Sequence, residues 1–300
     1  MVEEKKATKK EATPKKETKV AAKPIEHKTR VPRRNKNVFE KFKEKMDQKA
    51  KQSRGWAVGV TLGWAFLMML WVFAILIGTQ YLVAFILLGM NLSVSDTVLQ
   101  TIFTAITYSV SLVIIILVPW KVLGMGTTRD EIGMRGLPTW TDVLLAPVGF
   151  ILFMIVASFA LLVMQAIMPT IDWNQAQDVG FSGMYGQMDF ILAFICLVVI
   201  APLVEEMIFR GWLYGKMRSK MSAVPAILLV SLLFGIVHGQ WNVGVVVFVM
   251  SIARCIMREL TGTIWGGMLI HIIKNGIAFY ALFINPSFGS AAVGALLLTL

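Results

Sequence analysis

Long apolar stretches separated by short polar segments run from residue 56 almost to the C-terminus. A helix needs about 20 such residues to cross a bilayer core of about 30 Å. The pattern predicts an all-α fold, a polytopic transmembrane helical bundle with about seven spans. The predicted spans are residues 56–90, 97–118, 141–168, 190–216, 224–241, 243–257 and 263–284. Residues 286–300 are predicted to form a C-terminal tail or a short eighth helix.

Positive charge is concentrated at the N-terminus. Residues 1–54 contain 19 Lys and Arg against 8 Asp and Glu, so they carry the whole net charge of +11. Almost nothing in this segment could be buried, which predicts a mostly disordered basic tail. Loops with Lys or Arg alternate along the chain with loops that lack them. The positive-inside rule therefore places the N-terminus and the basic loops, including Arg254 in the loop 254–262, in the cytoplasm.

Composition narrows the class of protein further. The sequence is 56% hydrophobic and its mean hydropathy is +0.68, too apolar for an ordinary soluble domain. Cys196 and Cys255 lie far apart and form no CxxC pattern, so neither a disulfide framework nor a cysteine metal site is expected. No phosphate-binding loop is present, and no specific nucleic acid is expected as a partner.

Ionisable side chains within the predicted spans mark the candidate site. Burying a charged group in a bilayer costs at least about 2.5–3.5 kcal/mol on insertion scales, so such groups pair or line a wet cavity. They occur in the fourth, fifth and seventh predicted spans and are Glu205, Glu206, Arg210, His238, His271 and Lys274, together with the polar Asn275.

Their spacing assigns different tasks to the two glutamates. Adjacent residues point about 100° apart on a helix, and the i,i+4 spacing favours an ion pair between Glu206 and Arg210. Glu205 is then free for chemistry. Counted from the turn near residue 221, Glu205 and His238 lie 16 and 17 residues away, hence at about the same depth.

Two kinds of chemistry fit these residues. A carboxylate beside an imidazole, here Glu205 and His238, can act as a general base on water, while His271 and Asn275 can stabilise a developing oxyanion. Alternatively, Glu205, His238 and His271 supply three ligands for zinc and leave one position open. No HExxH or GxSxG motif is present.

Three motifs in one order carry a resemblance to a known family. EEMIFR (205–210) fits EExxxR, FGIVH (234–238) fits FxxxH, and HIIKN (271–275) fits HxxxN. Together they resemble the CPBP family, which joins CAAX prenyl proteases with bacteriocin-processing or immunity proteins, the Abi group. The resemblance covers about residues 140–285.

The resemblance implies a membrane-embedded peptidase. Glu205 and His238 then activate water, His271 and Asn275 form the oxyanion site, and Glu206, Arg210 and Phe234 support them. Some members are described as metalloproteases, and others use a catalytic glutamate without metal. Lys274 departs from the expected pattern, and it either pairs with a carboxylate or disables the enzyme.

The domain division follows from these observations. The expected parts are a basic cytoplasmic tail (1–54), N-terminal spans with a cytoplasmic loop (55–139), a CPBP-like protease core (140–285) and a C-terminal segment (286–300).

The expected function is hydrolysis of a peptide bond in a membrane-associated or lipidated substrate, prenylated or carrying a leader peptide. The alternatives are an inactive immunity or scaffold protein and a proton-coupled transporter. Membrane lipids are expected partners, and the expected location is the cell membrane if the source is bacterial. Because His271 lies about 8 residues inside the start of its span, the site is expected to open toward the cytoplasm.

Overall fold

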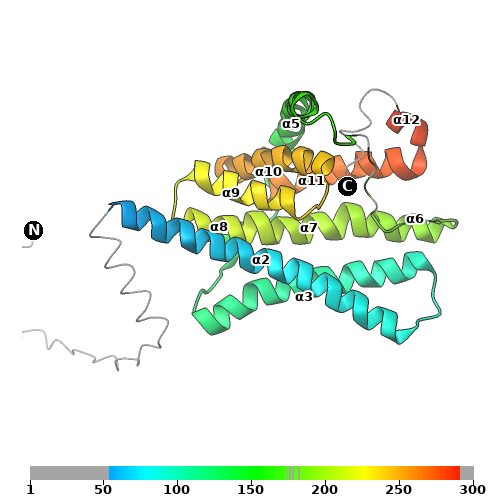
Figure 1. Cartoon of the computed structure of the whole chain (residues 1–300), viewed down its shortest axis with the longest axis horizontal. Coiled ribbons are helices and arrows are strands. Elements are labelled where there is room, and N and C mark those ends of the chain that lie inside the picture. Colours follow the sequence, from blue (N-terminus) through cyan, green and yellow to red (C-terminus); the bar gives the residue numbers. More distant parts are fainter. Residues whose placement is uncertain (1–53, 174, 176, 178, 182, 291–300) are drawn as a thin grey trace, which may run out of the picture.

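The computed structural model describes residues 54–290 apart from residues 174, 176, 178 and 182 (Figure 1). The described residues form helices and connecting loops, with no strand among them. The predicted all-α fold class is confirmed. The basic tail up to residue 53 and the last ten residues lie outside the described residues.

The helices are named as in Figure 1. The first half of the described chain contains α2 (Arg54–Met90), α3 (Asp96–Leu123), α4 (Arg129–Ile132) and α5 (Trp140–Ile167). One continuous helix follows, composed of α6 (Gln187–Phe194), η1 (Ile195–Ile200), α7 (Ala201–Glu205), η2 (Glu206–Leu213) and α8 (Tyr214–Arg218). The chain continues through α9 (Ala223–Ile236), α10 (Trp241–Thr261), α11 (Trp265–Phe279), η3 (Tyr280–Ile284) and α12 (Pro286–Ser290).

Five helices of the described chain are long and apolar enough to cross a membrane. They are Val58–Met90, Asp96–Leu123, Trp140–Ile167, Gln187–Arg218 and Trp265–Ile284. Several of them present large apolar side chains outward, as at Phe85, which is 77% exposed, and Phe159, which is 68% exposed. A lipid environment would cover these side chains, so the chain is an integral membrane protein with the fold of a polytopic helical bundle.

The predicted fifth and sixth spans, α9 and α10, are not among these five. α9 ends at Ile236, five residues before its predicted end, and its 14 residues rise about 21 Å, less than the bilayer core of about 30 Å. The prediction of residues 224–241 as one span is therefore wrong in length. α9 packs closely on α10 because Gly235 faces Gly244, where an added Cβ would lie 2.9 Å from the Gly244 carbonyl oxygen.

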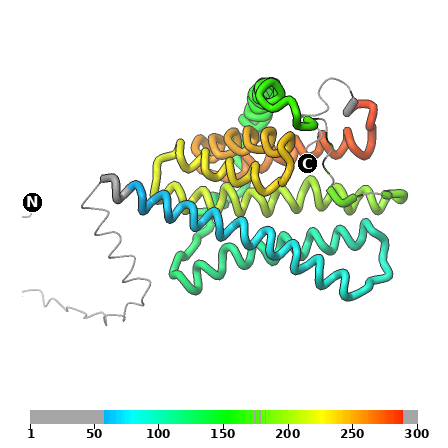
Figure 2. Tube along the Cα trace, viewed as in Figure 1, coloured from blue at the N-terminus to red at the C-terminus, as the bar shows by residue number. Residues whose placement is uncertain are grey.

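The continuous helix Gln187–Arg218 lies at the centre of the molecule. It contacts α3 on one side and α9, α10 and α11 on the other, while α5 packs against α10 and α11 (Figure 1). α2 lies against α3 (Figure 2). α2, α3, the central helix, α9, α10 and α11 run along one axis in alternating directions, whereas α5 is seen almost end-on in Figure 1. The bundle therefore has two ends. We call the end with the start of α2 and the loops 124–139 and 219–222 the basic end, and the end with the loops 91–95, 168–186 and 237–240 the far end.

Candidate functional site

The two glutamates lie where the central helix changes its winding. Glu205 ends α7, and Glu206 begins η2, a stretch of wider π-helical turns. A first π-helical stretch, η1, ends just before Pro202, which has no N–H to continue the regular hydrogen-bond ladder. Such turns shift the angular positions of side chains and are frequent at functional sites. Here Glu206 is fully buried, while Glu205 is partly exposed.

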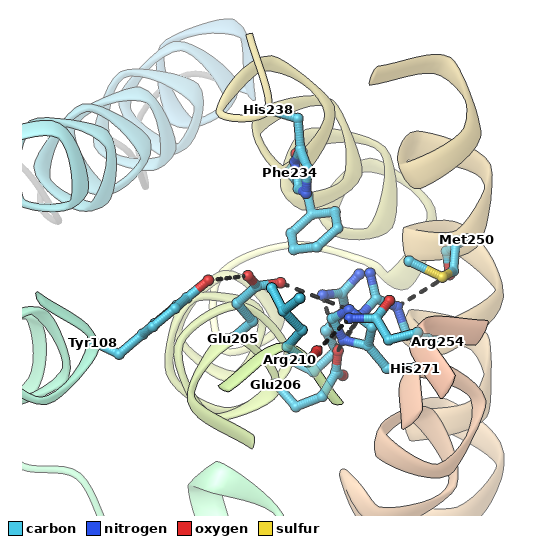
Figure 3. Close-up of polar contacts among 11 residues, drawn as sticks. Tyr108, Glu205, Glu206, Arg210, Phe234, His238, Met250, Arg254 and His271 are labelled. Carbon is cyan, nitrogen blue, oxygen red and sulfur yellow. Dashed lines mark hydrogen bonds and ion pairs between the residues drawn. The ribbon is translucent and has the colours of Figure 1, made fainter. Parts of the chain in front are cut away.

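Glu206 is the centre of a buried ion cluster. Its Oε1 accepts a hydrogen bond from Arg210 Nη1 at 3.2 Å and another from Arg254 Nη1, and none of the three side chains is exposed (Figure 3). The first contact is the ion pair expected from the i,i+4 spacing. The second corrects the sequence analysis, because Arg254 lies in the interior on α10 and not in a basic loop.

Phe234 holds both arginines in place. The guanidinium carbons of Arg210 and Arg254 lie 4.4 and 4.5 Å from the centroid of its ring. Cations over an aromatic face are attracted by the ring quadrupole. The ring also meets Phe209 edge-on, with 4.9 Å between the centroids. Phe234 therefore supports the ion cluster from α9.

His271 joins the cluster to Glu205. Its Nδ1 contacts Arg254 Nη1 and lies 3.3 Å from Glu206 Oε1. An arginine N–H can only donate, which requires Nδ1 to accept and leaves the proton on Nε2, whereas the Glu206 carboxylate can only accept, which requires Nδ1 to donate. This Nε2 lies 3.8 Å from Glu205 Oε2 (Figure 3). Arg254 and Glu206 thus hold the imidazole of His271 with its Nε2 toward Glu205.

Glu205 has a partner that the sequence analysis missed. Its Oε1 accepts a hydrogen bond from the hydroxyl of Tyr108, on α3, at 2.6 Å. The sequence analysis placed His238 beside Glu205 by depth alone, but the nearer imidazole is that of His271. No hydrogen bond between Glu205 and His238 is present in the described part of the chain.

His238 lies just after the end of α9. Its Nδ1 lies 2.7 Å from the carbonyl oxygen of Phe234, and because a carbonyl only accepts, Nδ1 carries the proton. Nε2 is then the acceptor nitrogen of this ring. Figure 3 shows His238 on the opposite side of Phe234 from the ion cluster.

One pocket contains the predicted site residues. It has a volume of about 470 Å³, and its wall includes Glu205, Phe234, His238, His271, Lys274 and Asn275. Tyr108 also lines it. The structure therefore brings the three motifs to one cavity, with Glu205 at its wall and Glu206 behind it.

The pocket extends toward the far end of the bundle. Its wall includes Gln80 in the last third of α2, Gln100 near the start of α3, and Gln177 in the loop 168–186. The sequence analysis expected the site to open toward the cytoplasm, on the side of the basic loops. The expected opening toward the basic end is wrong. The ion cluster and the buried Trp212 and Tyr214 fill that side of Glu205, and Arg210 is completely buried and paired with Glu206.

Asn275 and Lys274 lie on α11, one turn beyond His271. Asn275 Nδ2 donates to the carbonyl oxygen of Leu197 at 2.8 Å, which fixes the orientation of the amide. Lys274 is fully buried, and its Nζ has no hydrogen-bond partner among the described residues. It does not form the ion pair that the sequence analysis considered.

The zinc alternative finds little support in this arrangement. Within the described residues, no group of three or more His, Cys, Asp or Glu side chains is placed to hold a metal ion. The contacts with Arg254 and with the Phe234 carbonyl oxygen involve only the Nδ1 atoms of His271 and His238. We therefore derive no step through a metal.

The sequence did contain a signal for Arg254. This residue falls inside the predicted span 243–257 and was nevertheless counted with the loop that follows it. Tyr108 gave a weaker signal, because a tyrosine within a span packs as readily as it hydrogen-bonds.

Comparison with known proteins agrees with the motif pattern. Residues 187–277 match the family described as type II CAAX prenyl endopeptidase Rce1-like. This segment begins with the central helix and includes all three motifs. The resemblance to the CPBP family of membrane proteases, predicted from those motifs, is confirmed over these residues.

A curated relative gives a second match. The chain is 27% identical over 127 residues to the UPF0177 protein YxdF of Lactococcus lactis subsp. lactis. The aligned segment covers 42% of this chain and 66% of that protein. No solved structure matches the chain.

Proposed function

We propose that this protein is a membrane-embedded endopeptidase in which Glu205 activates the attacking water. The proposal rests on the different surroundings of two adjacent carboxylates. Glu206 is neutralised by two buried arginines, whereas Glu205 lies at the pocket wall between the Tyr108 hydroxyl and His271 Nε2. A carboxylate that is held in place but not neutralised is suited to general-base catalysis.

The residues of the pocket fit one sequence of proton transfers. Glu205 takes a proton from water as the water oxygen attacks the scissile carbonyl, and His238 Nε2 accepts a hydrogen bond from the same water. The Nε2–H of His271 and the free amide N–H of Asn275 stabilise the oxyanion of the tetrahedral intermediate. Protonated Glu205 then gives its proton to the leaving amine as the C–N bond breaks.

The proposed substrate is a lipidated or otherwise membrane-associated peptide. The matched family is described by its action on CAAX prenyl proteins, in which a cysteine near the C-terminus carries an isoprenoid. The apolar outer surface of the helices would hold the enzyme and such a lipid in the same bilayer. A leader peptide remains the alternative substrate.

Cleavage of a fluorogenic prenylated CAAX peptide by the purified full-length protein tests the proposal. The variant Glu205→Gln should lose a factor of about 10²–10⁴ in kcat and melt like the wild type. Glu259→Gln is the matched control, because Glu259 pairs with Arg218 near the end of α10, outside the pocket. It should cleave normally.

Two results would overturn the assignment. Wild-type turnover by Glu205→Gln would remove Glu205 from the chemistry. No cleavage by the wild type of either the prenylated peptide or a library of leader peptides would favour the inactive immunity or scaffold protein. Repeating the assay with a chelator tests zinc directly, and we expect the rate to be unchanged.

A further inference from the structure

Lys274 takes no part in the proposed hydrolysis. It is completely buried on α11, it lines the pocket with Glu205 and His271, and its Nζ has no hydrogen-bond partner among the described residues. Burying an ammonium group without a partner costs several kcal/mol. An anionic ligand in the pocket would supply the missing partner.

The charges around the pocket do not balance. Within the described part of the site, the buried cations are Arg210, Arg254 and Lys274, and the carboxylates are Glu205 and Glu206. Three positive charges against two negative ones leave one excess positive charge, and a protonated histidine would only add to it. Both arginines share Glu206, so Lys274 and Glu205 are the opposite charges left at the pocket wall, and no hydrogen bond or ion pair joins them in the described part of the chain.

We propose that Lys274 binds a carboxylate of the substrate close to the scissile bond and thereby sets the specificity of the enzyme. The proposal rests on the proposed peptidase function. It assigns to this pocket a substrate with an anionic group, which is either a free C-terminal carboxylate or an acidic side chain. A neutral peptide would leave the ammonium unpaired, and sites with unpaired buried polar groups reject such ligands strongly.

The position of Lys274 limits where this carboxylate lies. Lys274 follows His271 by three residues on one helix, so their Cβ atoms are about 5–6 Å apart. An extended peptide advances about 3.3–3.6 Å per residue. The carboxylate therefore belongs within about two residues of the carbonyl that His271 would contact.

Three fluorescent prenylated peptides of otherwise identical sequence test the inference. The first has a free C-terminal carboxylate, the second has a C-terminal amide, and the third has the amide together with a glutamate in the last position. Their binding is measured by anisotropy on the full-length Glu205→Gln protein, with and without Lys274→Met, so that no turnover occurs. The kcat/KM of the wild type and of the single variants is measured in parallel.

We expect the free acid or the glutamate peptide to bind at least tenfold more tightly than the neutral amide, and whichever peptide is preferred identifies the source of the carboxylate. Lys274→Met should reduce this preference to near one by weakening the anionic peptide alone. Lys274→Arg should retain most of it. Lys220→Met, which removes an exposed lysine beyond α8, should leave it unchanged.

Equal binding of the three peptides by the Glu205→Gln protein would overturn the inference, even if Lys274→Met failed to fold. An unchanged preference in a folded Lys274→Met protein would overturn it as well. A preference that depends on Lys274 in the binding assay, without cleavage by the wild type, would leave the anion site standing and refute the peptidase. The two proposals therefore fail separately.

Discussion

Replacing Glu206 by glutamine tests whether the buried ion cluster holds the bundle together. Glutamine has nearly the same shape as glutamate but no charge. Glu206 is the partner of both Arg210 and Arg254, and all three side chains are fully buried. The substitution therefore leaves two guanidinium groups in the interior without the carboxylate that accepts their hydrogen bonds.

The expected magnitude follows from the number of partners. Removing one member of a buried ion pair costs about 3–5 kcal/mol, and Glu206 serves two pairs, so we expect a loss at the upper end of this range or above. For a domain of about this size each kcal/mol lowers the melting temperature by about 2–4 °C, which gives a decrease of about 10–20 °C. Arg210→Met and Arg254→Met should each cost less, because Glu206 keeps one arginine.

Thermal unfolding in detergent, followed by intrinsic fluorescence, provides the measurement. Arg218→Met is the control, since Arg218 also pairs with a glutamate, Glu259, at 2.8 Å, but the two side chains are 37% and 33% exposed. Exposed pairs contribute about 0.2–1 kcal/mol, so this variant should melt within about 4 °C of the wild type. A Glu206→Gln protein that melts no lower than the Arg218→Met control would refute the reasoning, as would a reversed order in which either arginine variant is the least stable.

Three further predictions concern the site and its access. Tyr108→Phe should lower kcat about 10–100-fold, because a hydrogen bond to a charged group contributes about 1.5–3 kcal/mol; unchanged kinetics would exclude Tyr108 from positioning Glu205. Gln80 is an exposed residue of the pocket wall. After Cys196 and Cys255 are replaced, a cysteine at this position should react with a membrane-impermeant maleimide from the side opposite the N-terminal tail. Labelling from the tail side would place the opening at the basic end. A protein that starts at residue 38 should cleave in detergent like the full chain but lose salt-sensitive binding to anionic liposomes. Each basic residue near the membrane surface contributes about 1 kcal/mol to such binding. Retained binding would mean that the tail is not the lipid contact.

Helical periodicity and apolar length are local properties, and the sequence determined what depends on them. It gave the positions of the long helices to within a few residues, as for the predicted span 141–168 and the observed α5, Trp140–Ile167. It also separated Glu205 from Glu206, because an i,i+4 pair needs only one helix. The order of the three motifs was enough to predict the family resemblance.

Tertiary packing decided which side chains meet across helices. Counting residues from a turn estimates the depth of a side chain but not its rotation about the helix axis, so His238 was placed beside Glu205 although His271 is nearer. Arg254 and Tyr108 reach the site only because α10 and α3 turn those faces toward the central helix. The pocket points to the far end because the ion cluster and the aromatic side chains of η2 fill the other side, and that filling depends on the rotation and packing of several helices at once, which no single stretch of sequence contains.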